Sequence, residues 1–193
     1  MSKKREDARK TILDAAVEVI KERGARTVTI DRVAKRAGCA KGLVHYHFKT
    51  KAGMLGAVAD ALTANRQASW TAAFDAPSPK DAIDQTWALL SQESATGVIR
   101  AWTSLFQAGV LPEATVRDAV QGLGRALGDA TMKLMREIDL TPTIPPAEIG
   151  WLLGAVVHGM GFQLASQEAG DDLEGAYAAG WLGILSLFVP RRR

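Results

Sequence analysis

The chain has 193 residues, enough for one or two domains with a substantial buried core. Hydrophobic residues make up 47% and charged residues 23%, as in ordinary soluble globular proteins. Cys39 is the only cysteine, which excludes an intrachain disulfide and a cysteine-based zinc site and fits a reducing cytoplasm. The first seven residues are mostly charged and include no apolar segment typical of a secretory signal.

The net charge of +3 hides an uneven distribution of charge along the chain. Residues 1–51 hold 14 Lys and Arg against 6 Asp and Glu, whereas residues 52–193 hold 10 against 15. A basic first quarter on a neutral-to-acidic remainder is typical of a nucleic-acid-binding module. A solvated basic surface without a nucleic-acid partner is the alternative that charge alone leaves open.

Four helices are expected in the first part of the chain. Apolar residues at helical spacing predict a helix over residues 6–23, which is followed by a glycine. A shorter helix over 30–36 begins directly after Thr29, a residue suited to cap its N-terminus. A third helix over 40–47 follows after only a few residues, as a helix-turn-helix requires. The fourth helix is expected to run from about residue 51 to 74.

Five more helices are expected in the rest of the chain. Apolar side chains at helical spacing indicate one helix around Trp87, another around Trp102 and a long one that begins near Pro112. The proline-rich segment 141–146 cannot be helical throughout and is expected to be a connection. The last two helices are expected over about 147–167 and 172–188. Nine helices without any strand signal predict an all-α protein.

The third helix separates into two faces. Val44 and Phe48 are expected to point back toward the first two helices. Lys41 and His45, four residues apart, share the outward face. Gly42 keeps the helix thin between them, so that its backbone can approach another surface closely. A short helix with an apolar back and a slim basic front is typical of one that lies in the DNA major groove.

The pair His45 and His47 has two rival interpretations, a metal site and a catalytic base. Residues two apart on a helix diverge by about 200°, and no third ligand is close in sequence, so a shared metal ion is disfavoured. A general base needs a nucleophile and an orienting acid, and the sequence offers no such constellation. It also lacks a phosphate-binding or dinucleotide-binding glycine motif. A cytosolic enzyme is therefore the remote alternative, and neither a metal nor another cofactor is expected.

A pattern of spaced residues runs through positions 9–55. Its members are Arg9, Ile12, Leu13, Ala15, Ala16, Gly24, Thr27, Thr29, Val33, Ala34, Ala37, Gly38, Lys41, Gly42, His47, Phe48, Lys51 and Leu55. In these residues the chain resembles the DNA-binding domain of the TetR/AcrR repressors. The resemblance covers about a quarter of the chain and implies a nine-helix, all-α homodimer. It also implies a helix-turn-helix domain over residues 1–51 and a helical ligand-binding and dimerisation domain over residues 52–193.

The resemblance also implies roles on double-stranded DNA for eight residues. Thr29 would cap the second helix and donate a hydrogen bond to a phosphate, while Lys41 would contact guanine and Leu43 a thymine methyl group. The residues expected to face base edges are Lys41, Gly42, Leu43 and His45. Those expected to contact the phosphate backbone are Tyr46, His47 and Lys51, with Lys51 and the start of the fourth helix forming an anion site.

Three positions depart from the family's pattern. The family usually has Val-Ser where this chain has Cys39 and Ala40, so a hydroxyl that commonly caps the third helix is absent. Leu-Tyr is usual where Val44 and His45 stand, and an acid is common where Ala52 stands. Cys39 is expected to be a small core residue, with a redox-sensing thiol as the alternative.

Rows of small residues mark the last two helices. Glycine in a helix interior costs up to about 1 kcal/mol relative to alanine, so a close helix approach is expected there. By resemblance, the two helices pair with their copies across a two-fold axis. Close packing within one subunit is one alternative, and a membrane hairpin is a remote one because both segments are nearly free of charge. The candidate interface residues are Gly154, Gly161, Ala165, Ala176, Gly180 and Gly183.

Aromatic and methionine side chains in the larger domain suit a mostly apolar pocket for a small-molecule effector. The candidates are Trp87, Trp102, Phe106, Met132, Met135, Trp151, His158 and Phe162, with ordinary core packing as the alternative for each. The leading hypothesis is a repressor that binds a palindromic operator as a homodimer and is released by its effector. An activator, or a regulator without a small-molecule ligand, is the alternative.

Overall fold

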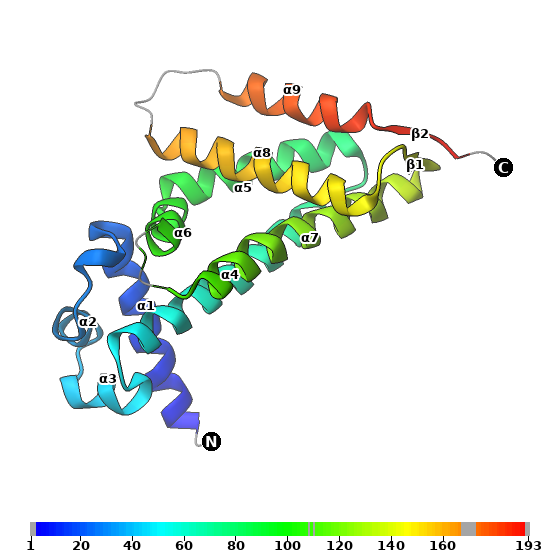
Figure 1. The fold of residues 1–193 in the computed structure, drawn as a ribbon. Coiled ribbons are helices and arrows are strands. Elements are labelled where there is room, and N and C mark those ends of the chain that lie inside the picture. The colour runs from blue at the N-terminus through cyan, green and yellow to red at the C-terminus, as the bar shows by residue number, and fades with distance from the viewer. Residues whose placement is uncertain (1–2, 108, 110, 167–172, 192–193) are drawn as a thin grey trace. The chain divides into compact units, whose positions relative to one another are not determined.

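The computed structural model describes residues 3–107, 109, 111–166 and 173–191 (Figure 1). In that part of the chain, nine α-helices, one 3-10 helix and two three-residue strands confirm the predicted all-α class. The predicted ends at residues 167 and 172 lie outside the described residues. The elements are α1 (Lys3–Arg23), η1 (Ala25–Thr27), α2 (Ile30–Ala37), α3 (Lys41–Phe48), α4 (Lys51–Ala73), α5 (Pro79–Ala95), α6 (Val98–Gln107), α7 (Glu113–Glu137), β1 (Leu140–Pro142), α8 (Pro146–Ser166), α9 (Leu173–Leu185) and β2 (Phe188–Pro190).

The sequence predicted neither the short 3-10 helix η1 nor the two strands. The strands pair antiparallel, with Thr141 opposite Val189. The backbone N–H of Thr143 donates to the carbonyl oxygen of Leu187 at 2.8 Å and continues the pairing beyond the strands. Strands of three residues are too short to show an alternating pattern in sequence, and each ends in a proline, which argues against a strand.

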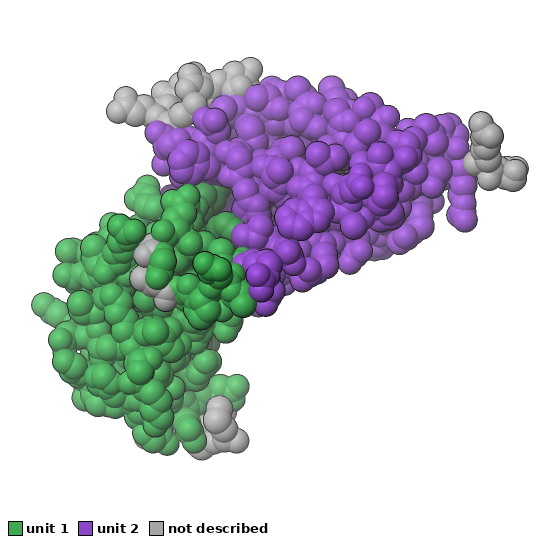
Figure 2. All heavy atoms as spheres, in the orientation of Figure 1, with its two compact units in different colours: residues 1–63, 97–116 green, residues 64–96, 117–193 purple. Residues whose placement is uncertain are grey.

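The described chain divides into two compact units (Figure 2). Unit 1 comprises Met1–Thr63 and Gly97–Val116, and unit 2 comprises Ala64–Thr96 and Arg117–Arg193. The helix α4 begins in unit 1 and ends in unit 2. The unit boundary falls inside α4, whereas the predicted domain boundary after residue 51 falls at its start, so that boundary stays a prediction.

Unit 1 is organised around the buried stripe of α1. Ile12, Ala16 and Ile20 are at most 1% exposed, which confirms the predicted inward face of this helix. The hydroxyl of Thr29 accepts a hydrogen bond from the backbone N–H of Arg32 at 3.2 Å, so Thr29 caps α2 as predicted. Gly38 ends α2 with φ 64°, a left-handed conformation that glycine adopts without strain. The cap and the glycine together set the tight turn into α3.

The helix α6 also belongs to unit 1, although it lies far along the chain. Its Ser104 hydroxyl accepts a hydrogen bond from the backbone N–H of Ala25 at 2.5 Å. Leu105 is fully buried on the same helix. This helix therefore completes the core behind α1 and η1.

In unit 2, three glycines allow α7 and α8 to approach closely. A Cβ atom on Gly150 would lie only 2.6 Å from the carbonyl oxygen of Gly124, and one on Gly128 would lie 3.0 Å from the Cα of Gly150. Backbone atoms cannot move aside as a flexible side chain can, so these positions require glycine. The contact explains part of the small-residue row in α8 by packing within one chain.

The helix α8 is long and apolar enough to cross a membrane, judged by length and composition alone. One third of its most apolar window is buried inside the chain. No other helix among the described residues passes the same test.

Candidate nucleic-acid interface

The helix α3 buries its apolar side chains in the core and exposes most of the others, as predicted. Val44 is fully buried and Phe48 is 7% exposed, so the helix is anchored in the core of unit 1. The exposed residues are Lys41, Gly42, Leu43, His45 and Tyr46. Leu43 is 37% and Tyr46 is 53% exposed. Five of the eight predicted DNA-contacting residues are therefore open to solvent on this helix.

Lys41 forms an ion pair with Asp31, a residue of α2 that the sequence did not indicate. The Lys41 Nζ atom lies 2.9 Å from Oδ1 and 3.2 Å from Oδ2 of Asp31. Both side chains remain mostly open to solvent, at 54% for Lys41 and 70% for Asp31. The pair joins the first turn of α2 to the first turn of α3.

A tight turn connects α3 to α4. Lys49 has φ 61° and ψ −52°, and the backbone N–H of Thr50 donates to the carbonyl oxygen of Phe48 at 2.6 Å. This is a γ-turn with positive φ at its centre, a rare and strained conformation. A Cβ atom on Gly53 would lie 2.6 Å from the same carbonyl oxygen. The helix α3 is thus joined to α4 by a short turn with close backbone contacts.

Cationic side chains gather around Tyr46 at the C-terminal end of α3. The guanidinium of Arg5 lies 5.2 Å and the ammonium of Lys49 lies 5.7 Å from the centre of the Tyr46 ring. Neither residue was a predicted contact, and only the general excess of basic residues pointed to them. Their positive charges add to the phosphate attraction of this surface.

His47 is half-buried, unlike its neighbours on the open face. Burial lowers the pKa of His47, and the positive charges of Arg5 and Arg9 lower it further. The imidazole is therefore neutral at neutral pH and offers hydrogen bonding rather than charge. Its predicted phosphate contact stays a prediction.

Lys51, the predicted anion-site residue, begins α4. Its Nζ atom donates to the backbone carbonyl oxygen of Arg26 at 3.2 Å, and the side chain is half-buried. The lysine therefore ties the start of α4 to η1. One hydrogen bond leaves two of its three N–H donors for a phosphate.

The departures from the family pattern are visible in the structure. Ala40 occupies the N-cap of α3 and provides no side-chain hydrogen bond. Cys39 is a half-buried free thiol. The ring of His45 faces the carbonyl oxygen of Lys49, with Nδ1 at 3.2 Å. Across the described ranges, no three His, Cys, Asp or Glu residues are grouped as a metal site would require.

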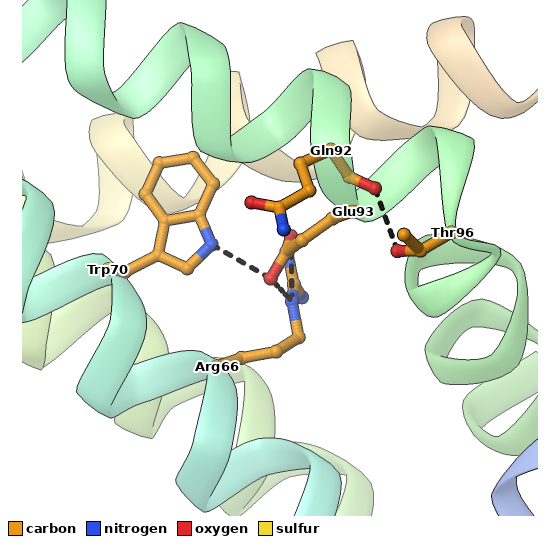
Figure 3. A network of polar contacts seen from close by, with 5 residues as sticks. All are labelled: Arg66, Trp70, Gln92, Glu93 and Thr96. Atoms are coloured by element: carbon orange, nitrogen blue, oxygen red, sulfur yellow. Dashed lines mark hydrogen bonds and ion pairs between the residues drawn. The ribbon is translucent and has the colours of Figure 1, made fainter.

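Unit 2 contains a buried ion pair between α4 and α5 (Figure 3). The guanidinium of Arg66 donates to both carboxylate oxygens of Glu93 at 2.7 to 3.1 Å, and the indole N–H of Trp70 donates to the same carboxylate at 3.2 Å. Arg66 and Glu93 are each only 5% exposed, and Trp70 is fully buried. Two side chains of α4 thus share the one carboxylate of Glu93 on α5.

An aromatic cluster lies in the same unit. Tyr177 of α9 is fully buried, with its ring 5.3 Å from Trp87 and 6.4 Å from Trp181 between ring centres. Its hydroxyl donates to the hydroxyl of Thr86 at 2.9 Å. Burial raises the pKa of the Tyr177 phenol. The cluster joins α5 to α9 and uses only Trp87 among the predicted pocket residues.

His158 of α8 is mostly enclosed by unit 2. Burial lowers its pKa from the ordinary 6.5 to about 4, and the positive charge of Arg66 acts in the same direction. A backbone hydrogen bond with Gly154 opposes the shift. The imidazole is thus neutral at physiological pH.

Acidification is expected to destabilise the chain through His158. His158 takes up a proton near pH 6.5 in the unfolded chain but only near pH 4 in the folded chain. Its contribution to the free energy of unfolding is therefore fully present above pH 6.5 and is lost as the pH falls from 6.5 to 4. Between pH 7.5 and 5, the parent should lose about 2 kcal/mol more than a His158→Gln variant. Urea unfolding at the two pH values measures the difference, and equal losses would contradict the buried neutral imidazole.

The eight candidate pocket residues divide between the two units. Trp102 and Phe106 lie on α6 in unit 1, where their ring centres are 4.3 Å apart, and the other six lie in unit 2. Met135 is 1% exposed, and Trp87 and Met132 are half-buried. In contrast, Trp151 and Phe162 are 57% and 55% exposed on α8. Core packing accounts for Met135 and for the pair on α6.

Two concave regions lie on unit 2. One is a cavity of about 350 Å³ between α7 and α8, lined by Gln121, Arg125, Asp129 and Trp151 around the close-packed glycines. The other, of about 870 Å³, is an open groove between α4 and α7. Both volumes lie in the range of small-molecule sites. Trp151 is the one predicted pocket residue that lines either of these two regions.

The six candidate interface residues also divide. Gly154 and Gly161 are buried within a single chain, and a Cβ atom on Gly154 would contact the Cα of Gly124 at 3.6 Å. Gly180 is half-buried against Val156. Packing inside one copy therefore accounts for these three glycines. The exposed candidates are Ala165, Ala176 and Gly183.

Larger apolar side chains are exposed beside them and were not predicted as interface residues. Trp151, Leu152 and Phe162 on α8 are 41 to 57% exposed. Leu182 on α9 is 65% exposed. We call these four residues the α8–α9 apolar face.

Comparison with known sequences places the first part of the chain in a family of regulators. Residues 12–58 match the sequence model described as bacterial regulatory proteins, tetR family. The HTH-type transcriptional regulator SrpR of Pseudomonas putida is 42% identical over 53 residues, a match that spans 28% of this chain and 25% of SrpR. BetI of Klebsiella pneumoniae, also an HTH-type transcriptional regulator, is 23% identical over 162 residues, 81% of this chain and 82% of BetI.

Solved structures share the fold along nearly the whole chain. The transcriptional regulator FadR of Bacillus subtilis, solved in complex with stearoyl-CoA, superposes with a TM-score of 0.71 at 16% identity. The match covers 91% of this chain and 97% of FadR. A gamma-butyrolactone receptor described as an ArpA-like protein gives a TM-score of 0.65 at 21% identity, over 97% of this chain and 90% of the receptor.

Proposed function

Since the chain belongs to the TetR family of transcriptional regulators and carries its DNA-binding helix-turn-helix, we propose that it is a repressor released by a small-molecule effector. The observation that carries the proposal is α3, a slim helix with a basic outward face and a buried back. Such a helix fits the major groove of DNA. The protein then acts in the cytoplasm, on double-stranded DNA and without a membrane partner.

On DNA, the exposed face of α3 reads bases while its surroundings hold the phosphates. Lys41 donates to guanine O6 and N7, and Leu43 contacts a thymine methyl group. Gly42 and His45 face neighbouring base edges. Phosphates are held by Tyr46 and His47 near the C-terminal end of α3, by Lys51 at the start of α4 and by Thr29 at the N-cap of α2.

The functional form is a homodimer built on α8 and α9. The α8–α9 apolar face leaves four large side chains open to water in one copy, as an unfilled interface does. The exposed small residues Ala165, Ala176 and Gly183 allow the helices of two copies to approach. Two-fold symmetry then presents two α3 helices to successive major grooves of a palindromic operator.

The effector binds in unit 2 and acts through α4. FadR was solved with stearoyl-CoA, a ligand with a long apolar chain, which supports a mostly apolar effector. The helix α4 starts at the tight turn after α3 and continues into unit 2. Operator binding needs the two α3 helices about 34 to 36 Å apart, so a shift of α4 by a few ångströms is enough to lose it. By thermodynamic linkage, the effector binds more tightly to the state in which α4 is displaced, and DNA binds more tightly to the state in which it is not.

Two lysine variants test the DNA-binding roles. With a duplex that the parent enriches from a randomised library, Lys41→Ala should lower base discrimination by about 1 to 3 kcal/mol at one position of each half-site. Lys51→Ala should instead weaken all duplexes alike and reduce the log–log salt slope by about 0.9 per lost phosphate contact. Fluorescence anisotropy at several salt concentrations measures both effects.

Lys80→Ala is the matched control for these variants. It removes the same charge from an exposed lysine on α5 in unit 2 and should leave discrimination and salt slope unchanged. If Lys41→Ala and Lys51→Ala both bind like this control, the roles are wrong. If the parent binds its operator equally with and without every apolar compound screened by tryptophan fluorescence, a regulator without an effector is the better description.

A further inference from the structure

The segment of chain around α2 and α3 contains one acidic residue among many basic ones. From residue 23 to residue 59, the sequence has eight Lys and Arg and a single acid, Asp31. This carboxylate lies in the first turn of α2 and contacts the Lys41 ammonium with both oxygens, at 2.9 and 3.2 Å. Lys41 is one of the base-reading residues of the proposed function. The lone acid of this segment is therefore paired with a side chain that takes part in sequence recognition.

Folding stability does not explain this ion pair. Both side chains are more than half exposed, and an exposed ion pair contributes little to stability because water screens it. A carboxylate in the first turn of a helix interacts favourably with the helix N-terminus, but this effect needs no contact with Lys41. On a surface that must attract phosphate, an acid also opposes binding. The position of Asp31 calls for a role in recognition.

Such a role follows from the chemistry of lysine. Its ammonium is a point charge on a flexible chain and is attracted to any phosphate within reach. The Asp31 carboxylate accepts hydrogen bonds from the Lys41 ammonium at the start of α3 and so holds the ammonium beside the exposed part of that helix. It also cancels one positive charge, so the attraction between this surface and the phosphates of any DNA sequence is weaker. In the groove, the O6 and N7 acceptors of guanine can replace the carboxylate as hydrogen-bond partners of the Lys41 ammonium. Another base at that position replaces it less well.

We propose that Asp31 is a specificity-determining residue that positions Lys41 for base reading and weakens non-specific DNA binding. This inference rests on the proposed function, because it assumes that α3 enters the major groove. Asp31 acts through Lys41 and is a positioning residue. Its effect therefore concerns the ratio of affinities for selected and unselected DNA more than either affinity alone.

The test is Asp31→Asn, which keeps the side-chain shape and removes the charge. The variant should bind an unselected duplex library more tightly and with a steeper salt slope, by about one phosphate contact. The affinity ratio between the parent's selected duplex and the unselected library should fall roughly tenfold. A thermal unfolding scan checks that the variant folds like the parent, as expected for an exposed position.

Glu22→Gln is the matched control. Glu22 of α1 also forms an exposed ion pair, with Arg36 of α2 at 2.6 Å, and its replacement changes the net charge by the same amount. This variant should tighten binding to both duplexes alike and leave the ratio unchanged. If Asp31→Asn lowers the ratio no more than Glu22→Gln does, the inference is overturned.

A double-variant cycle separates positioning from a structural role. In a Lys41→Met background, Asp31→Asn should leave the affinity ratio unchanged, because the side chain that Asp31 positions is gone. A loss of the same size in that background would overturn the positioning role. If instead the parent enriches no sequence at all, the proposed function fails together with this inference, whereas failure confined to Asp31→Asn leaves the proposed function intact.

Discussion

Replacing Glu93 by Gln is expected to lower the free energy of unfolding by about 3 to 5 kcal/mol. The carboxylate receives the guanidinium of Arg66 and the indole N–H of Trp70 in a site where all three side chains are at most 5% exposed. Glutamine keeps the volume but removes the charge that balances Arg66. Urea unfolding followed by tryptophan fluorescence measures the loss.

Two further variants show whether burial is the cause. Asp84→Asn, on the same helix, breaks the exposed pair with Lys80 and should change stability little. Replacing Arg66 by Met together with Glu93 by Leu should recover most of the lost stability, because no buried charge then remains. A loss for Glu93→Gln that is no larger than that for Asp84→Asn would show that the pair is not enclosed as described.

Phe162→Glu is expected to convert the proposed homodimer to a monomer. The residue is 55% exposed on the α8–α9 apolar face, and a two-fold axis would place two new carboxylates in the interface. Losing two buried phenyl rings costs about 3 kcal/mol or more, which weakens the dimer by at least a hundredfold. Sedimentation velocity at micromolar concentration measures the change. Affinity for a palindrome should fall accordingly, while affinity for a single half-site stays.

Ile138→Glu is the control for this variant. Ile138 is an exposed apolar residue in unit 2 that lies outside α8 and α9, with 43% of its side chain exposed. Its replacement should leave the dimer intact. Should Phe162→Glu remain as dimeric as Ile138→Glu, the interface lies elsewhere on the chain.

The recognition helix could be predicted well because its determinants are local. Val44 and Phe48 recur at a spacing of four residues, and the structure buries both of them while Lys41 and His45 stay exposed. The cap on α2 was equally visible, since Thr29 directly precedes the helix. Spacing and cap preference depend on neighbours within one or two turns, and sequence shows those directly.

Features that depend on distant neighbours escaped prediction. Ser104 reaches Ala25 across 79 positions, which places α6 in unit 1. Arg66 stands among polar and small residues, where nothing in sequence distinguishes a buried charge from a solvated one. The rows of small residues predicted that helices approach closely. Periodicity does not show which helix is the partner, and in the structure Gly150 of α8 lies against Gly124 of α7 in the same chain. The pairing of elements is decided by packing and topology rather than by local pattern.

In the proposed function, two copies of α3 read successive major grooves of one duplex. The most direct measurement is selection of the purified parent chain on a randomised duplex library at low ionic strength, followed by sequencing of the enriched DNA. We predict a two-fold symmetric sequence whose half-site centres lie about 10 base pairs apart, bound with a steep dependence on salt. A chain that stays monomeric and enriches no sequence would contradict the account.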